Sequence, residues 1–225
     1  MLENLKNFFA AEGAKLKEMT FKEKAAYIWE YYKFPIIAIA AVLLIASSII
    51  NSVWINPPKK LYLQIAYYAG YVDDAALTGA CAMLEDAIMT PEERQTMQIA
   101  GTSFMLNSGD PQMDMAIQQK FAAMIAVNEL DLLIVNDADL DSLVSQGMLM
   151  PLKDAISGSL PQKLSDKLIE AADENAVKAD YAIKLDGNKF FNDNGLPADG
   201  LCLGVVVNTK NPDNVKRALE YIFNS

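Results

Sequence analysis

The hydropathy pattern is dominated by one uncharged segment near the amino terminus. Residues 34–55, FPIIAIAAVLLIASSIINSVWI, contain 22 amino acids without Asp, Glu, Lys or Arg. As an α-helix this segment is about 33 Å long, which matches the roughly 30 Å hydrocarbon core of a bilayer. Aromatic residues gather just before it and Trp54 lies near its end, as is typical of membrane interfaces. The pattern predicts a transmembrane helix and disfavours the alternative, a buried helix of a soluble protein.

This segment is expected to be a retained signal anchor. Thirty-three residues precede it, which is long for the basic region of a signal peptide, and no convincing cleavage pattern follows it. The nearby lysines are Lys15, Lys17, Lys22, Lys24 and Lys33 on the amino-terminal side, and Lys59 and Lys60 on the other. The positive-inside rule therefore predicts a cytoplasmic amino terminus and an extracytoplasmic domain at 56–225 in a single-pass protein of the cell membrane.

Residues 1–33 form a separate part with helical character. Thr20 and Glu23 match a capping box, which predicts a helix from Phe21 that can run directly into the span. Pro35 is expected in the first turn of the span, where its missing N–H costs nothing. Three roles stay open for residues 1–33: an amphipathic helix on the membrane, a partner-binding helix, or a solvated juxtamembrane segment.

Beyond the span, segments with strand-like and helix-like patterns alternate. The apolar runs that predict strands are 61–68, 97–106, 129–135 and 201–208, and residues 181–185 and 189–191 are expected to pair as a hairpin. The expected helices follow Asp73, Asn107 to Asp110, Asp139 and Asn211. This alternation predicts an α/β fold with a mostly parallel sheet and helices on both faces, in three layers.

Composition narrows the possible chemistry. The chain has 225 residues, of which 52% are hydrophobic and none is histidine. The absence of histidine excludes Ser-His-Asp and Cys-His nucleophiles and His-ligated zinc or haem. The net charge is −10, and residues 56–225 hold 13 basic and 24 acidic residues, which argues against binding nucleic acid. We therefore expect no enzymatic activity and no cofactor.

Two segments resemble the extracellular solute-binding proteins of ABC importers. The first is DLLIVNDADLDSLVSQGMLMPLKDAI at 131–156, where an apolar strand leads into a polar turn, a short helix and a G-x-L-x-PL pattern. The second is GVVVNTKNPDNVKRALEYIF at 204–223, which is similar to the returning strand, Asn-Thr turn and helix of that family. The resemblance implies a bacterial protein whose outer domain has the fold of one lobe of a periplasmic binding protein.

The chain also departs from that family. About 45 residues, 157–200, separate the two segments, which is too few for a second lobe. The family members are usually lipoproteins or free in the periplasm, and this chain has no lipobox cysteine. The resemblance therefore implies a first lobe whose ligand cleft is shallow or lost.

Candidate ligand-binding residues follow the ends of the expected strands, where an α/β sheet leaves a crevice. They are Tyr68, Tyr71, Asn107, Asp110, Asn136 and Asp137. The alternative, which we favour, is that such residues form turns and helix caps, as expected for Asp139. Ser142 and Met148 stand where a calcium loop needs Gly and Glu, so no metal site is expected.

The two cysteines, Cys81 and Cys202, lie in a helical and a strand pattern. Outside the cytoplasm they can form a disulfide. Both have apolar neighbours, and buried free thiols are the more frequent outcome for such residues. We therefore expect no disulfide.

The sequence leaves two function classes. The first is a non-enzymatic membrane protein whose outer domain, similar to a solute-binding protein, binds a protein partner or a small solute. The alternative is an accessory or sensory subunit that relays the state of the outer domain to the cytoplasmic helix. The expected partners are the lipid bilayer and either another membrane protein or a small solute. A membrane-anchored hydrolase is disfavoured because histidine is absent.

Overall fold

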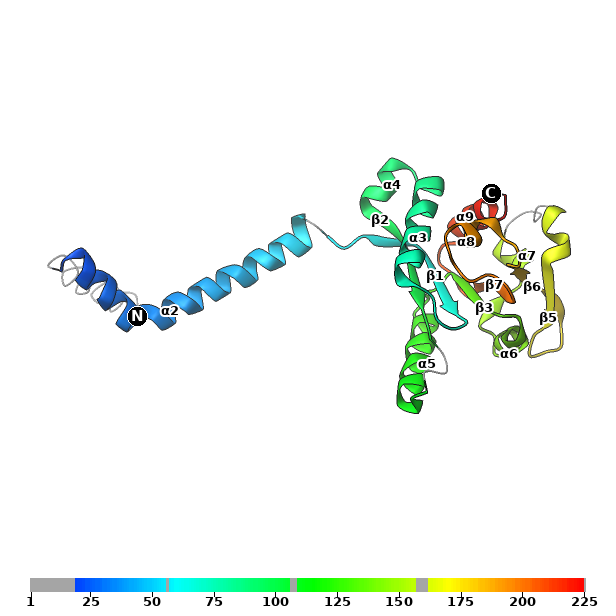
Figure 1. Ribbon diagram of the computed structural model, residues 1–225, viewed down its shortest axis with the longest axis horizontal. Coiled ribbons are helices and arrows are strands. Elements are labelled where there is room, and N and C mark those ends of the chain that lie inside the picture. Colours follow the sequence, from blue (N-terminus) through cyan, green and yellow to red (C-terminus); the bar gives the residue numbers. More distant parts are fainter. Residues whose placement is uncertain (1–18, 56, 106–108, 157–161, 225) are drawn as a thin grey trace. The chain divides into compact units, whose positions relative to one another are not determined.

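The computed structural model describes residues 19–55, 57–105, 109–156 and 162–224. The chain divides into two compact units, residues 1–58 and residues 59–225. The described part of the first unit is dominated by one long helix, and the second contains a sheet with helices packed on it (Figure 1).

The long helix, α2 (Phe21–Ile50), continues into a short π-helical turn, η1 (Asn51–Ile55). It begins at the predicted capping box, where the N–H and Oγ1 of Thr20 both donate to the carboxylate of Glu23 at 2.8 Å. None of its residues is buried, and it is long and apolar enough to cross a membrane. An exposed apolar helix of this kind is consistent with a signal anchor or a signal sequence.

One expectation about this helix was wrong. Pro35 lies inside α2 and not in the first turn of a separate span, because the helix already begins at Phe21. The capping box, 15 residues earlier, sets the helix start, and proline is tolerated within apolar spanning helices.

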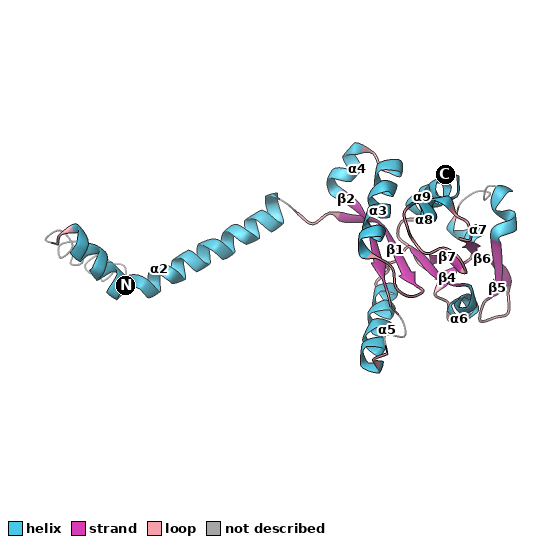
Figure 2. Ribbon diagram, viewed as in Figure 1, coloured by secondary structure: helices cyan, strands magenta, loops and turns pink. Residues whose placement is uncertain are grey.

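The sheet of the second unit has seven strands, shown in magenta in Figure 2. Their order is β2-β1-β3-β7-β6-β5, with β4 paired to β7 off this path. The strands are β1 (Lys60–Tyr68), β2 (Met97–Ser103), β3 (Leu132–Asn136), β4 (Leu149–Met150), β5 (Leu168–Ala172), β6 (Lys178–Lys184) and β7 (Leu201–Val206).

The sheet is mixed, so the expectation of a mostly parallel sheet was wrong. Strand β1 is parallel to both β2 and β3, whereas the pairs β3–β7, β4–β7, β5–β6 and β6–β7 are antiparallel. Hydrophobic patterning does not reveal strand direction, because a fully apolar strand such as β7 buries both faces in either direction. The connection between β6 and β7 holds one short helix, and antiparallel neighbours need no long crossover.

Helices cover both faces of the sheet. One buried cluster joins the sheet to α3 (Asp74–Ile88), α7 (Leu152–Ala155), α8 (Lys189–Asp193) and α9 (Pro212–Asn224). The other cluster joins the opposite face to α5 (Pro111–Ala126) and α6 (Leu140–Ser145). The remaining helical elements are α4 (Pro91–Thr96) and the 3-10 turns η2 (Asp137–Asp139) and η3 (Gln162–Lys167). The three-layer arrangement is thus present around a mixed sheet.

The segment between residues 131–156 and 204–223 extends this same sheet. Its described residues, 162–200, form η3, β5, β6 and α8. The expected hairpin between 181–185 and 189–191 was wrong, because β6 pairs with β5 and β7 while residues 189–191 begin α8. Asn188 starts that helix by accepting the N–H of Phe191 at 3.3 Å, and this cap favours a helical turn.

A buried carboxylate connects three elements near the start of β3. Asp131 is 2% exposed. Its carboxylate accepts the N–H of Gln64 in β1 at 2.8 Å and the hydroxyl of Thr209. The side-chain amide of Asn211 donates to both carboxylate oxygens at 3.2 and 3.3 Å. Asp131 therefore joins β1 to the loop that leads from β7 into α9.

Candidate ligand groove at the ends of the parallel strands

Strands β1 and β3 end side by side, and a depression lies where they end. Tyr68 pairs with Val135 at the last step of their register, and Asn136 is the final residue of β3. The depression has a volume of about 220 Å³ and is lined by Tyr68, Ala69, Gly70, Asp114, Gln118, Asn136 and Asp139. The ends of the parallel strands are thus hollowed, as expected for an α/β sheet.

A second depression, of about 440 Å³, adjoins the first. Its lining residues come mainly from α5 and α6, among them Gln118, Ser142 and Gln146. Tyr68, Gln118 and Asp139 line both depressions. The two depressions therefore form one feature, which we call the α5–α6 groove.

One wall of the groove is supported by packed aromatic rings. The rings of Tyr68 and Phe121 are stacked with their centroids 4.2 Å apart, and Phe104 meets both rings edge-on. Burial, together with the negative charge of Asp139, raises the pKa of the Tyr68 phenol. The phenol is therefore protonated at neutral pH and can donate or accept a hydrogen bond.

The polar end of the groove is organised by Asn136 and Asp139. The side-chain amide of Asn136 donates to Oδ2 of Asp139 at 2.9 Å. Asp139 was expected to cap α6, and this was wrong: its carboxylate makes no side-chain cap on α6 and accepts from Asn136. The reason is that the 3-10 turn η2 precedes α6 directly, so Asp139 already has helical dihedral angles, with φ −92° and ψ −10°.

The other candidate residues lie apart from the groove. Tyr71 is 73% exposed and lines neither depression. Asp110 caps α5 by accepting the N–H of Gln112 at 2.9 Å. Asp137 donates its N–H to the carbonyl of Gly200 at 3.1 Å and has one buried carboxylate oxygen without a partner among the described residues. Asn107 lies outside the described residues.

Several groove residues come from helices that the strand-end rule does not cover. Asp114 and Gln118 lie four residues apart in α5, and Ser142 and Gln146 are likewise four apart in and after α6. Residues four apart share one face of a helix. The four-residue spacing of these polar pairs was the available signal, and it was missed.

The two cysteines lie in different hydrophobic clusters. Cys81 of α3 belongs to the cluster on one face of the sheet, and Cys202 of β7 belongs to the cluster on the other face. Both are buried free thiols. Burial raises the pKa of Cys81 to about 12 and raises that of Cys202 as well. Neither thiol therefore has the low pKa of a reactive nucleophile.

No family model matches the chain, and no curated protein matches it. Among the described residues, no group of three or more Cys, Asp or Glu side chains is placed to hold a metal ion.

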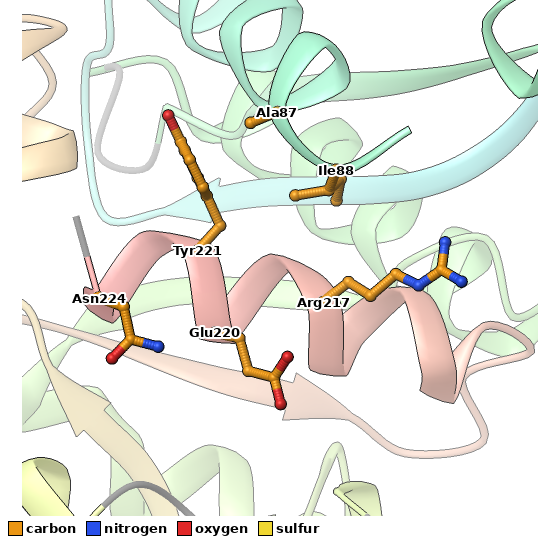
Figure 3. A pocket seen from close by; sticks show the side chains of 6 residues that line it. All are labelled: Ala87, Ile88, Arg217, Glu220, Tyr221 and Asn224. Atoms are coloured by element: carbon orange, nitrogen blue, oxygen red, sulfur yellow. The ribbon is translucent and has the colours of Figure 1, made fainter. Parts of the chain in front are cut away.

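A further shallow depression, of about 480 Å³, lies between α3 and α9 (Figure 3). Ala87 and Ile88 line it from α3, and Arg217, Glu220, Tyr221 and Asn224 line it from α9. The guanidinium of Arg217 already donates to Oη of Tyr62 at 3.0 Å and lies 3.7 Å from the carboxylate of Glu93. The one cation of this depression is thus engaged, which makes it a weaker candidate for binding a charged ligand.

Proposed function

We propose that this chain is a membrane-anchored, non-enzymatic binding protein that holds a small polar solute in the α5–α6 groove. The observation that carries the proposal is the convergence of Tyr68, Gln118 and Asp139 from three elements on one hollow. A few polar groups that converge on a partly apolar hollow are typical of small-molecule sites. Their position at the ends of parallel strands is where α/β sheets usually bind ligands.

The charge of the groove indicates which solutes it accepts. Asp114 and Asp139 contribute carboxylates, and the residues that line the two depressions include neither Lys nor Arg. A carboxylate or phosphate ligand would be repelled there, whereas an ammonium group would be attracted. We therefore propose a solute that is uncharged or carries a positive charge, with its cationic group near Asp139.

A binding role also fits the chemistry of the lining residues. The groove contains no thiol, and the chain has no histidine to act as a general base. The raised pKa of Tyr68 keeps its phenol protonated, which disfavours it as a nucleophile. These side chains are suited to hydrogen bonding and charge pairing.

We further propose that α2 is a retained anchor with its amino terminus in the cytoplasm, which places residues 59–225 outside. The excess of lysines before the apolar segment supports this orientation. Glu174 lies in an exposed turn, so a Glu174→Cys variant should react with a membrane-impermeant maleimide in whole cells. A Lys22→Cys variant should react only after permeabilisation. The reverse pattern of labelling would overturn the orientation.

An accessory or sensory role is the second candidate. The observation that favours it is the continuity of α2, which runs without a break from Phe21 to Ile50. A continuous helix that begins before the apolar segment can transmit a shift or rotation of the span to the residues ahead of it. Replacing residues 1–33 should leave solute binding intact and abolish any such signal.

The solute proposal is tested by thermal unfolding of the full chain in a nonionic detergent. The probes are spermidine, lysine and choline as cations, glucose as a neutral solute, and citrate as an anion. A solute present at about 100 times its dissociation constant stabilises the folded state by about 2.7 kcal/mol. We expect the midpoint of thermal unfolding to rise with at least one of the cations or with glucose. It should not rise with citrate.

Matched variants locate the binding. Asp139→Asn and Gln118→Ala should remove the stabilisation, because they change the groove directly. Asp141→Asn removes the same charge two residues away, in the first turn of α6, at a residue that does not line the groove, and it should retain the stabilisation. The absence of any shift with all five probes, or an undiminished shift in Asp139→Asn, would refute the proposal.

A further inference from the structure

The sheet has two edges, and the strands that form them differ in charge. Strand β5 forms one edge and β2 the other (Figure 1). The edge strand β5 carries a charged residue, Glu170, which forms an ion pair with Lys178 of β6 at 3.0 Å. Charges on an edge strand hinder the addition of another strand. The β5 edge is therefore protected.

Strand β2 lacks this protection. Its sequence, Met97–Ser103 (MQIAGTS), contains no charged residue and no proline. The register of the β1–β2 pair shifts between Leu61 and Leu63, and the five residue pairs that follow, from Leu63 with Ile99 to Tyr67 with Ser103, are regular. A regular, uncharged edge presents a row of main-chain donors and acceptors that another strand can use.

The hydrogen bonds show which groups of β2 face outward. The N–H of Phe104 donates to the carbonyl of Tyr67 at 2.8 Å, toward β1. The N–H of Ile99 donates to Oε1 of Glu85 at 2.6 Å, away from β1. Main-chain groups alternate in direction along a strand, so those of Gly101 and Ser103 also point away from β1. Glu85 therefore pairs with only the first of these outward donors.

The outward groups of this edge are accessible. Gly101 is exposed although Leu77 of α3 packs over its Cα, where an added Cβ would lie 2.5 Å from Cγ of Leu77. The exposed part of Gly101 is thus its main chain at the edge. Its neighbours Ala100, Thr102 and Ser103 are small, so a second backbone can approach this stretch closely.

The charges around the edge indicate what binds there. Helix α3, which packs on β2, carries Asp74, Glu85 and Asp86 and no basic residue, and Asp86 forms an ion pair with Arg94 of α4. The surrounding domain, residues 56–225, has 24 acidic and 13 basic residues, so a second copy of the chain would be repelled. An extended segment with Lys or Arg side chains would be attracted, and Glu85 lies at the edge to pair with one of them.

We propose that the β2 edge from Ile99 to Ser103 binds an extended, basic segment of a protein partner, which joins the sheet as an additional strand. Main-chain hydrogen bonds to Gly101 and Ser103 supply the pairing, and the carboxylate of Glu85 at the edge supplies the preference for basic residues. This surface is distinct from the α5–α6 groove. Failure of peptide binding at the β2 edge therefore does not affect the proposed solute binding, and the reverse also holds.

The test uses the full chain in nonionic detergent micelles and a fluorescent eight-residue peptide of alternating Lys and Val. Binding is measured by fluorescence anisotropy. A peptide methylated on the amide nitrogens of one edge and an alternating Glu-Val peptide are the controls. The Lys-Val peptide is expected to bind and both controls to bind at least tenfold more weakly. Equal binding of the methylated peptide, or no binding of the Lys-Val peptide up to about 1 mM, overturns the proposal.

Two pairs of variants locate the contact. Ser103→Pro removes one outward N–H and spares the bonds to β1, so it should weaken binding about fivefold to tenfold, whereas Ser103→Ala should change it less than twofold. Glu85→Gln should weaken binding, and Glu220→Gln, the same change on α9, should not. Equal binding by all four variants overturns the proposal.

Hydrogen exchange gives a readout that does not depend on whether Ser103→Pro folds. In the unmodified chain, the Lys-Val peptide should slow exchange of the Gly101 and Ser103 amides. Unchanged exchange at both amides overturns the proposal. Dimerisation of the chain through β2 in the absence of peptide overturns it in favour of a second copy as the occupant.

Discussion

Replacing Asp131 by Ala should destabilise the folded domain strongly. The carboxylate is 2% exposed and accepts hydrogen bonds from the main chain of Gln64 and the side chains of Thr209 and Asn211. Alanine leaves these three donors without their acceptor, the N–H of Gln64 in the buried interior and the side chains of Thr209 and Asn211 in a partly buried loop. An unsatisfied buried donor costs about 1–3 kcal/mol, and partial relaxation of the loop after β7 reduces the sum. We expect a loss of about 3–5 kcal/mol in the free energy of unfolding.

The measurement is urea unfolding of residues 59–225, which contain both hydrophobic clusters. In thermal unfolding of the same residues, the expected loss in the free energy of unfolding lowers the midpoint by roughly 6–20 °C for a domain of this size. Asp131→Asn keeps one acceptor oxygen and should lose less than Asp131→Ala. Asp141→Ala, an exposed carboxylate, serves as control and should change stability by less than about 0.5 kcal/mol. A loss below about 1 kcal/mol for Asp131→Ala would refute the assignment of Asp131 as a structural connection.

Three further predictions concern two glycines and the two thiols. Gly101→Ala should destabilise the domain by about 1–3 kcal/mol, because its Cβ would lie 2.5 Å from Cγ of Leu77, and Leu77→Ala should relieve much of this clash in the double variant. Gly79→Ala, in α3 with open space around its Cβ position, should instead stabilise the domain by about 0.5–1 kcal/mol in the same unfolding assay. At pH 8 the folded domain should not react with iodoacetamide, since the raised pKa values of Cys81 and Cys202 leave almost no thiolate; reaction should require unfolding or a much higher pH. Rapid alkylation of the folded domain, detected by mass spectrometry, would contradict the burial of both thiols.

The candidate groove was only partly predictable from the sequence. The strand-end rule pointed to Tyr68 and Asn136, which do line the groove. The same rule also selected Tyr71 and Asp110, which lie apart from it. Gln118 was not selected, because its role depends on how α5 lies along the ends of β1 and β3. A position along the chain shows where a strand ends but not which side chains of a neighbouring helix face that end.

The sequence by itself determined the features that depend on local periodicity and composition. These features are the uncharged run in α2, its capping box at Thr20 and the helical period of α3, α5 and α9. Each follows from the types of residues that lie within a few positions of one another along the chain. Only the tertiary structure decided the direction in which β7 runs against β3, the addition of β5 and β6 to the same sheet, and the joining of Gln64, Asp131 and Asn211. An apolar strand gains the same burial in either direction, so its direction is set by the connections and partners that the whole fold allows.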